Sequence, residues 1–357
     1  MAAPMPTVSA ADPLVIWGGG AIGGTIAAYW ARAGIPVLLV DIVQEHVAAC
    51  RTSGLRIEGK IDNYTQQLPA ATPAELKGTY SRIVLAVKAQ ATADAVKSLL
   101  PHLAPDGYIL SAQNGLNETV IAQIAGPART MGCFVNFGAD WLGPGRILYG
   151  GRGEVYVGEI DNAVRPRTHE MHRLLQAFEP EAVLTDNIWG VLWSKLSYAS
   201  MLFASSLNND GMAGNFGDPA RQAVFATLGR EVLDVALARG IRPVAIPCFD
   251  PAAFMPGGSQ AAVRAGLDHL AERRRNTGKT HSGFWRDLAV RKRRTEVDPL
   301  MGAVAALAQE SGVETPALST LIDLVHDIED GRRELSMNTF NVLQAKCEQR
   351  SPTTSAA

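Results

Sequence analysis

The sequence predicts an α/β protein in which a doubly wound parallel sheet is followed by an all-helical C-terminal domain. Short apolar segments alternate with helical segments through the first half of the chain, which is typical of parallel strands joined by crossover helices. From about Asn187 onward, apolar residues recur at helical spacing instead. The length of 357 residues also suits two domains, since one domain usually spans roughly 100–200 residues. We therefore expect a flexible leader at 1–13, a sheet domain at 14–185, a helical domain at 186–350 and a polar tail at 351–357.

The predicted strands of the first domain are short apolar runs that end in glycine or polar residues. The first run, 14–17, stops at three glycines, which favours a buried parallel strand. A helix is expected next over 21–33, with Gly34 as its C-terminal cap. Further strands are expected at 35–40, 83–87 and 108–111, and the glycine-rich region 138–158 is expected to close the edge of this domain.

The second domain is predicted to consist of long helices, because charged and apolar residues alternate there with helical periodicity. The expected helices span 189–207, 219–239, 261–275, 285–311 and 317–328.

Composition and charge exclude several classes of protein. The net charge is −2, so we expect no nucleic-acid partner, because such a protein needs a strongly basic face. Four dispersed cysteines without a C-x-x-C pair favour a reducing, cytoplasmic setting. The uncharged stretch 14–31 contains five glycines and follows no basic residue, so we expect neither a membrane span nor a signal peptide. We expect no metal site either, because His169 and His172 stand without a third ligand.

A glycine motif follows the first predicted strand. Gly18, Gly20 and Gly23 satisfy G-x-G-x-x-G, with Ala21 and Ile22 between the last two. In a Rossmann domain the first glycine permits a tight turn, the second lets the backbone approach a pyrophosphate, and the third allows close packing of helix on strand. Amides at the start of the helix then face the phosphates. The plainer interpretation is a glycine-rich turn without a ligand, but the flanking strand and helix favour a dinucleotide site.

Asp41 stands at the carboxyl end of the second predicted strand, where dinucleotide sites recognise the adenosine ribose. A carboxylate there accepts hydrogen bonds from both ribose hydroxyls and repels a 2′-phosphate. No arginine lies among the next four residues. The sequence therefore predicts NAD as the cofactor, with NADP as the alternative.

Five ordered motifs resemble the ketopantoate reductase (2-dehydropantoate 2-reductase) family, from residue 14 to about residue 328. They are V-K-A-Q-A-T at 87–92, Q-N-G-L at 113–116, F-G-A with G-P-G at 137–145, D-N-I-W with L-W-S-K-L at 186–196, and T-E-V-D at 295–298. The resemblance implies a fold similar to 6-phosphogluconate dehydrogenase, with a Rossmann domain, a helical domain and the substrate in the cleft between them.

The resemblance also implies roles for individual residues. Lys195 takes the place of the catalytic lysine and Glu296 that of a glutamate that contacts the substrate. Lys88 and Asn114 fall on positions that line the nicotinamide end of the cleft, Asn114 also facing the substrate. The chemistry agrees, because hydride delivery to a ketone builds negative charge on oxygen and needs a proton donor beside it.

Each of these residues also has a plainer interpretation. Lys195 could be a lysine whose stem lies along an apolar helix, and Glu296 an exposed helical charge. Lys88 could lie at the edge of the sheet, and Asn114 could belong to an ordinary Asn-Gly turn.

The chain departs from the family pattern where the substrate is expected. The family places asparagines four and eight residues after the catalytic lysine, but here those positions are Ala199 and Phe203. Apolar side chains cannot replace these amide hydrogen bonds, so we expect a more apolar, bulkier or aromatic substrate than ketopantoate. Ser282, which precedes the segment bearing Glu296, is expected to touch the substrate or to cap a helix.

The sequence thus predicts an NAD-preferring dehydrogenase similar to ketopantoate reductase, which interconverts a 2-oxo acid or related ketone with its alcohol. One alternative is a genuine NADPH-dependent 2-dehydropantoate 2-reductase of pantothenate synthesis. Another is a nucleotide-binding sensor without catalysis. We also expect a small-molecule substrate and a homodimer.

Overall fold

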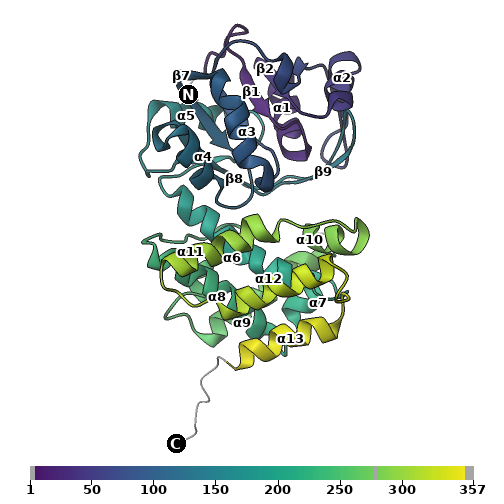
Figure 1. Ribbon diagram of the computed structural model, residues 1–357, viewed down its shortest axis with the longest axis vertical. Coiled ribbons are helices and arrows are strands. Elements are labelled where there is room, and N and C mark those ends of the chain that lie inside the picture. The colour runs from purple at the N-terminus through teal and green to yellow at the C-terminus, as the bar shows by residue number, and fades with distance from the viewer. Residues whose placement is uncertain (1–4, 277–279, 350–357) are drawn as a thin grey trace, which may run out of the picture. The chain divides into compact units, whose positions relative to one another are not determined.

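The computed structural model describes residues 5–276 and 280–349. Part of the predicted leader, residues 1–4, and the whole predicted tail lie outside these residues. The chain forms two units, whose boundary along the sequence falls between Ile188 and Trp189 (Figure 1).

The first unit contains an eight-stranded sheet in the order β12-β11-β8-β7-β6-β1-β2-β5. All neighbouring strands pair in parallel except β11 and β8, which are antiparallel. The predicted doubly wound sheet is therefore confirmed. Its strands are β1 Leu14–Trp17, β2 Val37–Val40, β5 Ala70–Ala71, β6 Tyr80–Leu85, β7 Leu103–Ser111, β8 Thr130–Val135, β11 Val155–Glu159 and β12 Val183–Leu184.

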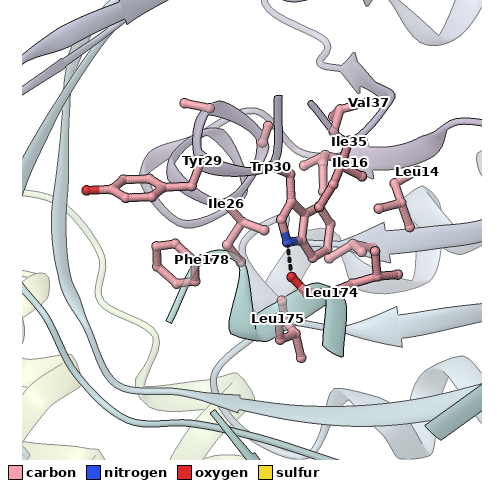
Figure 2. Packing of buried hydrophobic residues seen from close by; sticks show 14 of the residues in the cluster. Leu14, Ile16, Ile26, Tyr29, Trp30, Ile35, Val37, Leu174, Leu175 and Phe178 are labelled. Atoms are coloured by element: carbon pink, nitrogen blue, oxygen red, sulfur yellow. Dashed lines mark hydrogen bonds between the residues drawn. The ribbon is translucent and has the colours of Figure 1, made fainter. Parts of the chain in front are cut away.

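Alternate residues of the central strands enter two separate apolar clusters, as expected for strands that are buried on both faces. Helices α1 (Ala21–Arg32), α2 (Gln44–Thr52) and α5 (Pro166–Gln176) contribute to one cluster. Helices α3 (Thr92–Leu99) and α4 (Asn117–Ala125) contribute to the other. Trp30 of α1 lies in the centre of the first cluster, where its indole N–H donates to the carbonyl of Leu174 over 2.6 Å (Figure 2).

The glycine-rich region does more than close the edge of the main sheet. Strands β9 (Gly138–Gly143) and β10 (Arg146–Gly151) join β3 (Leu55–Glu58) and β4 (Tyr64–Gln66) in a second sheet, in the order β4-β3-β10-β9. Only β11 joins the main sheet, where it lies between β8 and the edge strand β12. The second sheet was not predicted, because β3 and β10 pair across a long stretch of chain that leaves no local signal.

The uncharged stretch 14–31 consists of β1, a glycine turn and most of α1. In the described parts of the chain, every helix is too short or too polar to traverse a lipid bilayer.

The second unit is helical, as predicted. Its longer helices are α6 Ile188–Ala204, α7 Met212–Gly217, α8 Gln222–Ala238, α9 Gln260–Asn276, α11 Ala303–Glu310, α12 Pro316–Glu329 and α13 Met337–Glu348. Helix α8 packs against α11, α12 and α13. Glu231 is a buried residue of α8. Its carboxylate accepts the backbone N–H groups of Ala317 and Leu318, over 3.1 and 2.7 Å, and so caps the start of α12.

The prediction of one continuous helix over 285–311 was wrong. A short helix α10 (Gly283–Trp285) runs into a π-helical turn at Arg286–Val290, an irregular segment follows, and a second π-helical turn at Asp298–Gly302 leads into α11. Pro299 explains the restart, because proline is tolerated in the first turn of a helix but not in its interior. The interruption is important because it takes Glu296 out of a helix and places it in a loop.

One buried carboxyl group has no counter-charge among the described residues of the first unit. Glu118, in the first turn of α4, is fully buried, and its oxygens make no well-formed hydrogen bond within the described part of the chain. Burial raises the pKa of Glu118 to about 8, and the weaker opposing effects of its own backbone N–H and of the Ser111 hydroxyl do not offset this. The side chain is therefore protonated at neutral pH.

This raised pKa predicts a pH-dependent stability. The folded protein holds the Glu118 proton more tightly than the unfolded chain, so the free energy of unfolding should fall as the pH rises from about 5 to about 8. Each unit of pKa difference corresponds to about 1.4 kcal/mol. Urea unfolding of the wild type and of Glu118→Gln across this range measures the effect. The variant should show a flatter profile, and parallel profiles would contradict the assignment.

Candidate active site

The glycine turn between β1 and α1 has the shape that a dinucleotide requires. Gly18 has a φ of +105°, which favours glycine. A Cβ at Gly23 would collide with the carbonyl oxygen of Gly18, so α1 lies directly against the turn. A Cβ at Gly20, by contrast, would meet nothing within 4 Å. The open side of the turn therefore lies at Gly20, where the backbone can approach a pyrophosphate.

The first turn of α1 presents backbone donors to this open side. The N-cap residue is Gly20, no side chain in the described residues caps this end, and the first turn holds no acidic residue. Ala21 and Ile22, both half-buried, contribute the next two amides. Uncapped amides at the positive end of a helix bind phosphate groups, so these residues fit a dinucleotide.

Asp41 is hydrogen-bonded to the same glycine turn. Its carboxylate accepts the backbone N–H of Gly19 over 2.7 Å and that of Val43 over 2.9 Å. A carboxylate has about four acceptor positions, so these two bonds leave room for ribose hydroxyls. Ile42 beside it is 79% exposed and offers an apolar surface. The arrangement fits an adenosine ribose with free hydroxyls.

Two motifs that are remote in sequence meet through a buried polar network. The side-chain amide of Gln113 donates to the carbonyl of Val87 (2.9 Å) and to the hydroxyl of Thr92 (2.8 Å). That hydroxyl lies 2.8 Å from the Oδ1 of Asn117, whose Nδ2 donates to the carbonyl of Asn114 over 2.6 Å. The network thus fixes the backbone on both sides of this part of the site.

Two predicted site residues border this network. Lys88 directly follows Val87 and is exposed, whereas Asn114 is half-buried. Both lie just beyond strand ends, after β6 and β7, where open α/β sheets bind their ligands.

Helix α6 of the second unit carries the candidate catalytic lysine. Lys195 is the only charged residue in the sequence of α6 and is half-buried on a helix whose other side chains are mostly buried. Ala199 and Phe203 follow at intervals of four residues and so lie on the same face. Ala199 is 8% exposed and Phe203 is fully buried.

Phe203 does not reach the surface of this face, because Phe284 covers it. The two rings are stacked with their centroids 3.6 Å apart and their planes 12° from parallel. Phe284 itself is half-buried, whereas Phe203 is fully buried. Sequence reasoning missed Phe284, because nothing near it in the sequence indicates a contact with α6.

Glu296 lies in the irregular segment before α11 and is 8% exposed. Its neighbour Thr295 is anchored to the far end of α12, where a carboxylate oxygen of Glu329 accepts both its N–H and its hydroxyl over 2.7 Å. Arg294 donates to Glu329 and to Asp330. Glu329 therefore fixes the position of Glu296. It was not identified from the sequence, because it is remote from the family motif.

The hydroxyl of Ser282 accepts the N–H of Trp285 over 3.0 Å and caps α10. The four basic residues before Glu296, residues 291–294, include two arginines that are fixed by a nearby carboxylate. Arg291 and Arg293 both donate to the buried carboxylate of Asp287, at 2.8 and 3.0 Å. This run lies in a loop, inside the range 285–311 for which a helix was predicted.

Both halves of the chain match one family. Residues 14–162 match ketopantoate reductase PanE/ApbA, and residues 187–329 match its C-terminal part. The curated 2-dehydropantoate 2-reductase of Mesorhizobium japonicum is 25% identical over 338 residues, covering 87% of this chain and 96% of that protein.

Solved structures show the same fold. A ternary structure of D-mandelate dehydrogenase with NADH and anilino(oxo)acetate has a TM-score of 0.77 at 22% identity, covering 89% of this chain and 98% of that one. A PanE/ApbA family ketopantoate reductase from Ralstonia eutropha has a TM-score of 0.74 at 25% identity, covering 90% of this chain and all of that one.

Proposed function

Because the chain belongs to the ketopantoate reductase family of NAD(P)-dependent oxidoreductases acting on a CH–OH group, we propose that it is an NAD-preferring 2-hydroxy acid dehydrogenase. Its substrate carries an apolar or aromatic group in place of the hydroxylated chain of ketopantoate. The single observation that carries this proposal is the face of α6, where Lys195 is followed by Ala199 and by Phe203 beneath Phe284.

The cofactor preference rests on Asp41. Its negative charge, held by two backbone amides, favours ribose hydroxyls and disfavours a 2′-phosphate. Gly18, Gly20, Ala21, Ile22 and Gly23 would hold the pyrophosphate, and Lys88 and Asn114 would line the nicotinamide end. A bound nicotinamide dinucleotide supplies the hydride acceptor for oxidation and the hydride donor for reduction.

The substrate class follows from what the α6 face can and cannot bind. Side chains without donors or acceptors at 199 and 203 leave a substrate hydroxyl unpaired, which costs binding energy. The half-buried ring of Phe284 instead favours an aryl or large alkyl group. An enzyme of the same fold, D-mandelate dehydrogenase, has been solved with anilino(oxo)acetate, which suggests aryl 2-oxo acids as test compounds.

The second unit would supply the proton chemistry. In oxidation, the neutral amine of Lys195 takes the proton of the substrate hydroxyl as the C–H hydride leaves. In reduction, the ammonium returns that proton to the carbonyl oxygen. Glu296 would orient the substrate or the amine from a loop that Glu329 holds in place, and Ser282 would lie at the edge of this site. Asn114 would position the substrate from the first unit.

The alternative is a genuine NADPH-dependent 2-dehydropantoate 2-reductase, the activity for which the curated relative is named. A homodimer and a cytoplasmic location remain predictions from the sequence.

Steady-state kinetics separate the two functions. The wild type should oxidise mandelate and related 2-hydroxy acids with NAD, with a kcat/KM at least roughly tenfold above that for pantoate or for NADP, because the lost polar contacts penalise pantoate. If ketopantoate with NADPH gives the highest kcat/KM, both the substrate and the cofactor proposals are wrong.

Lys195→Ala tests the role of the lysine. Loss of a positioned acid–base group should lower kcat by roughly 10²-fold or more while leaving the NADH dissociation constant unchanged. Lys346→Ala, at an exposed lysine of α13, is the matched control and should retain wild-type kinetics. A near-normal kcat in Lys195→Ala would show that the lysine is not the acid–base group.

Asp41→Ala tests cofactor choice. Loss of the carboxylate should raise the KM for NAD roughly tenfold and narrow the gap between NAD and NADP, since the repulsion of a 2′-phosphate is removed. Glu45→Ala removes an exposed carboxylate four residues away and controls for net charge. An unchanged ratio of the two KM values in Asp41→Ala would contradict the assignment.

A further inference from the structure

A buried histidine links the glycine turn to the second sheet. His46 lies on α2 with 1% of its surface exposed. Its Nε2 is 2.8 Å from the carbonyl oxygen of Gly19, and its Nδ1 accepts the backbone N–H of Gly145 over 2.9 Å. Since the Gly145 amide can only donate, Nδ1 is the acceptor, so Nε2 carries the hydrogen and donates to Gly19. Both ring nitrogens are therefore used, and the imidazole is neutral.

The peptide groups of Gly19 are consequently held from two sides. Asp41 accepts the N–H of Gly19, and His46 donates to its carbonyl. Gly19 is the residue immediately before Gly20, where the turn is open. Fixing the Gly19 carbonyl sets the plane of the Gly19–Gly20 peptide, and with it the direction of the Gly20 N–H.

The other end of the link is also anchored. Gly145 lies in the turn between β9 and β10 with a φ of +70°, and its carbonyl accepts the N–H of Arg56 in β3 over 2.8 Å. A Cβ at Gly145 would lie 2.8 Å from the Cβ of Ala49, so only glycine lets the turn approach α2 this closely. The ring of Trp141 covers His46 edge-on, with the ring centroids 6.3 Å apart. This accounts for Gly145 in the G-P-G motif at 143–145, which the proposed function leaves unused.

We propose that His46 is a positioning residue for the dinucleotide, which holds the glycine turn in its phosphate-binding conformation by connecting Gly19 to Gly145. The inference rests on the dinucleotide-binding part of the proposed function and is independent of the substrate. Without the imidazole, two buried backbone groups lose their partners, and the turn has to be ordered by the ligand itself.

Three variants separate this role from a general contribution to folding. His46→Leu keeps an apolar side chain but removes both hydrogen bonds. His46→Gln restores a donor and an acceptor whose separation is close to that of the two ring nitrogens. His172→Leu is the control, because it removes a histidine bond to the Ala182 carbonyl in the same unit, away from the glycine turn.

The readouts are the dissociation constants of NADH and ADP-ribose by calorimetry, together with kcat and both KM values. His46→Leu should raise the cofactor dissociation constants and the KM for NAD roughly tenfold, as expected for the loss of a buried hydrogen bond. The kcat at saturating NAD and the KM for the hydroxy acid should not change. His46→Gln should return the affinity most of the way to wild type, and His172→Leu should bind NADH normally.

Wild-type cofactor affinity in folded His46→Leu, or equal losses in the Leu and Gln variants, would overturn the proposal. If His46→Leu does not fold, His46→Asn replaces it, because its shorter amide reaches Gly145 but not Gly19. A folded His46→Asn with wild-type NADH affinity would then overturn it. If the wild type itself bound neither NADH nor NADPH, the proposed function would fail first, so the two failures are distinguishable.

Discussion

The close approach of α1 to β1 is the contact on which the first unit depends. A Cβ at Gly23 would collide with the carbonyl of Gly18, with Ile16 and with Ala86, so no larger residue allows the helix to lie where it does. This position brings the amides at the start of α1 to the end of β1. It also carries Trp30 into the core, where the indole reaches the carbonyl of Leu174. The conformation of the glycine turn and the packing of the sheet are thus consequences of one steric constraint.

Carboxylates that accept backbone N–H groups fix turns, loops and a helix end in both units. Asp41 holds Gly19 and Val43, Glu231 holds the start of α12, and Glu329 holds Thr295 at its end. Two charge-assisted bonds to a backbone restrict its position more tightly than an exposed ion pair does. Glu118 shows the converse. Burial without such donors leaves that carboxyl protonated, with its pKa raised to about 8.

Features encoded locally could be predicted from the sequence, and features made by long-range contacts could not. The sheet, the glycine turn and most helices follow from apolar runs, glycines and spacing, and the resemblance to the family pointed to Lys195 and Glu296. His46, Phe284 and Glu329 were missed, because their partners Gly145, Phe203 and Thr295 lie in distant segments. The break in the helix predicted over 285–311 did have a local signal, Pro299. The helical periodicity of the surrounding sequence outweighed that signal.

Because Phe203 stacks on Phe284, the departure from the family pattern at position 203 depends on the residue at position 284. Phe203 is fully buried, so an asparagine at that position alone would leave an amide beneath the Phe284 ring without a hydrogen-bond partner. Phe284 alone, without Phe203, would lie over a cavity. A change at position 203 or at position 284 alone therefore does not produce a polar surface, and the two residues must change together. Because α6 holds Lys195 on the same face, the same helix that places the amine also sets the apolar character of the surface beside it. One structural element thus positions both the Lys195 amine and the apolar side chains at 199 and 203.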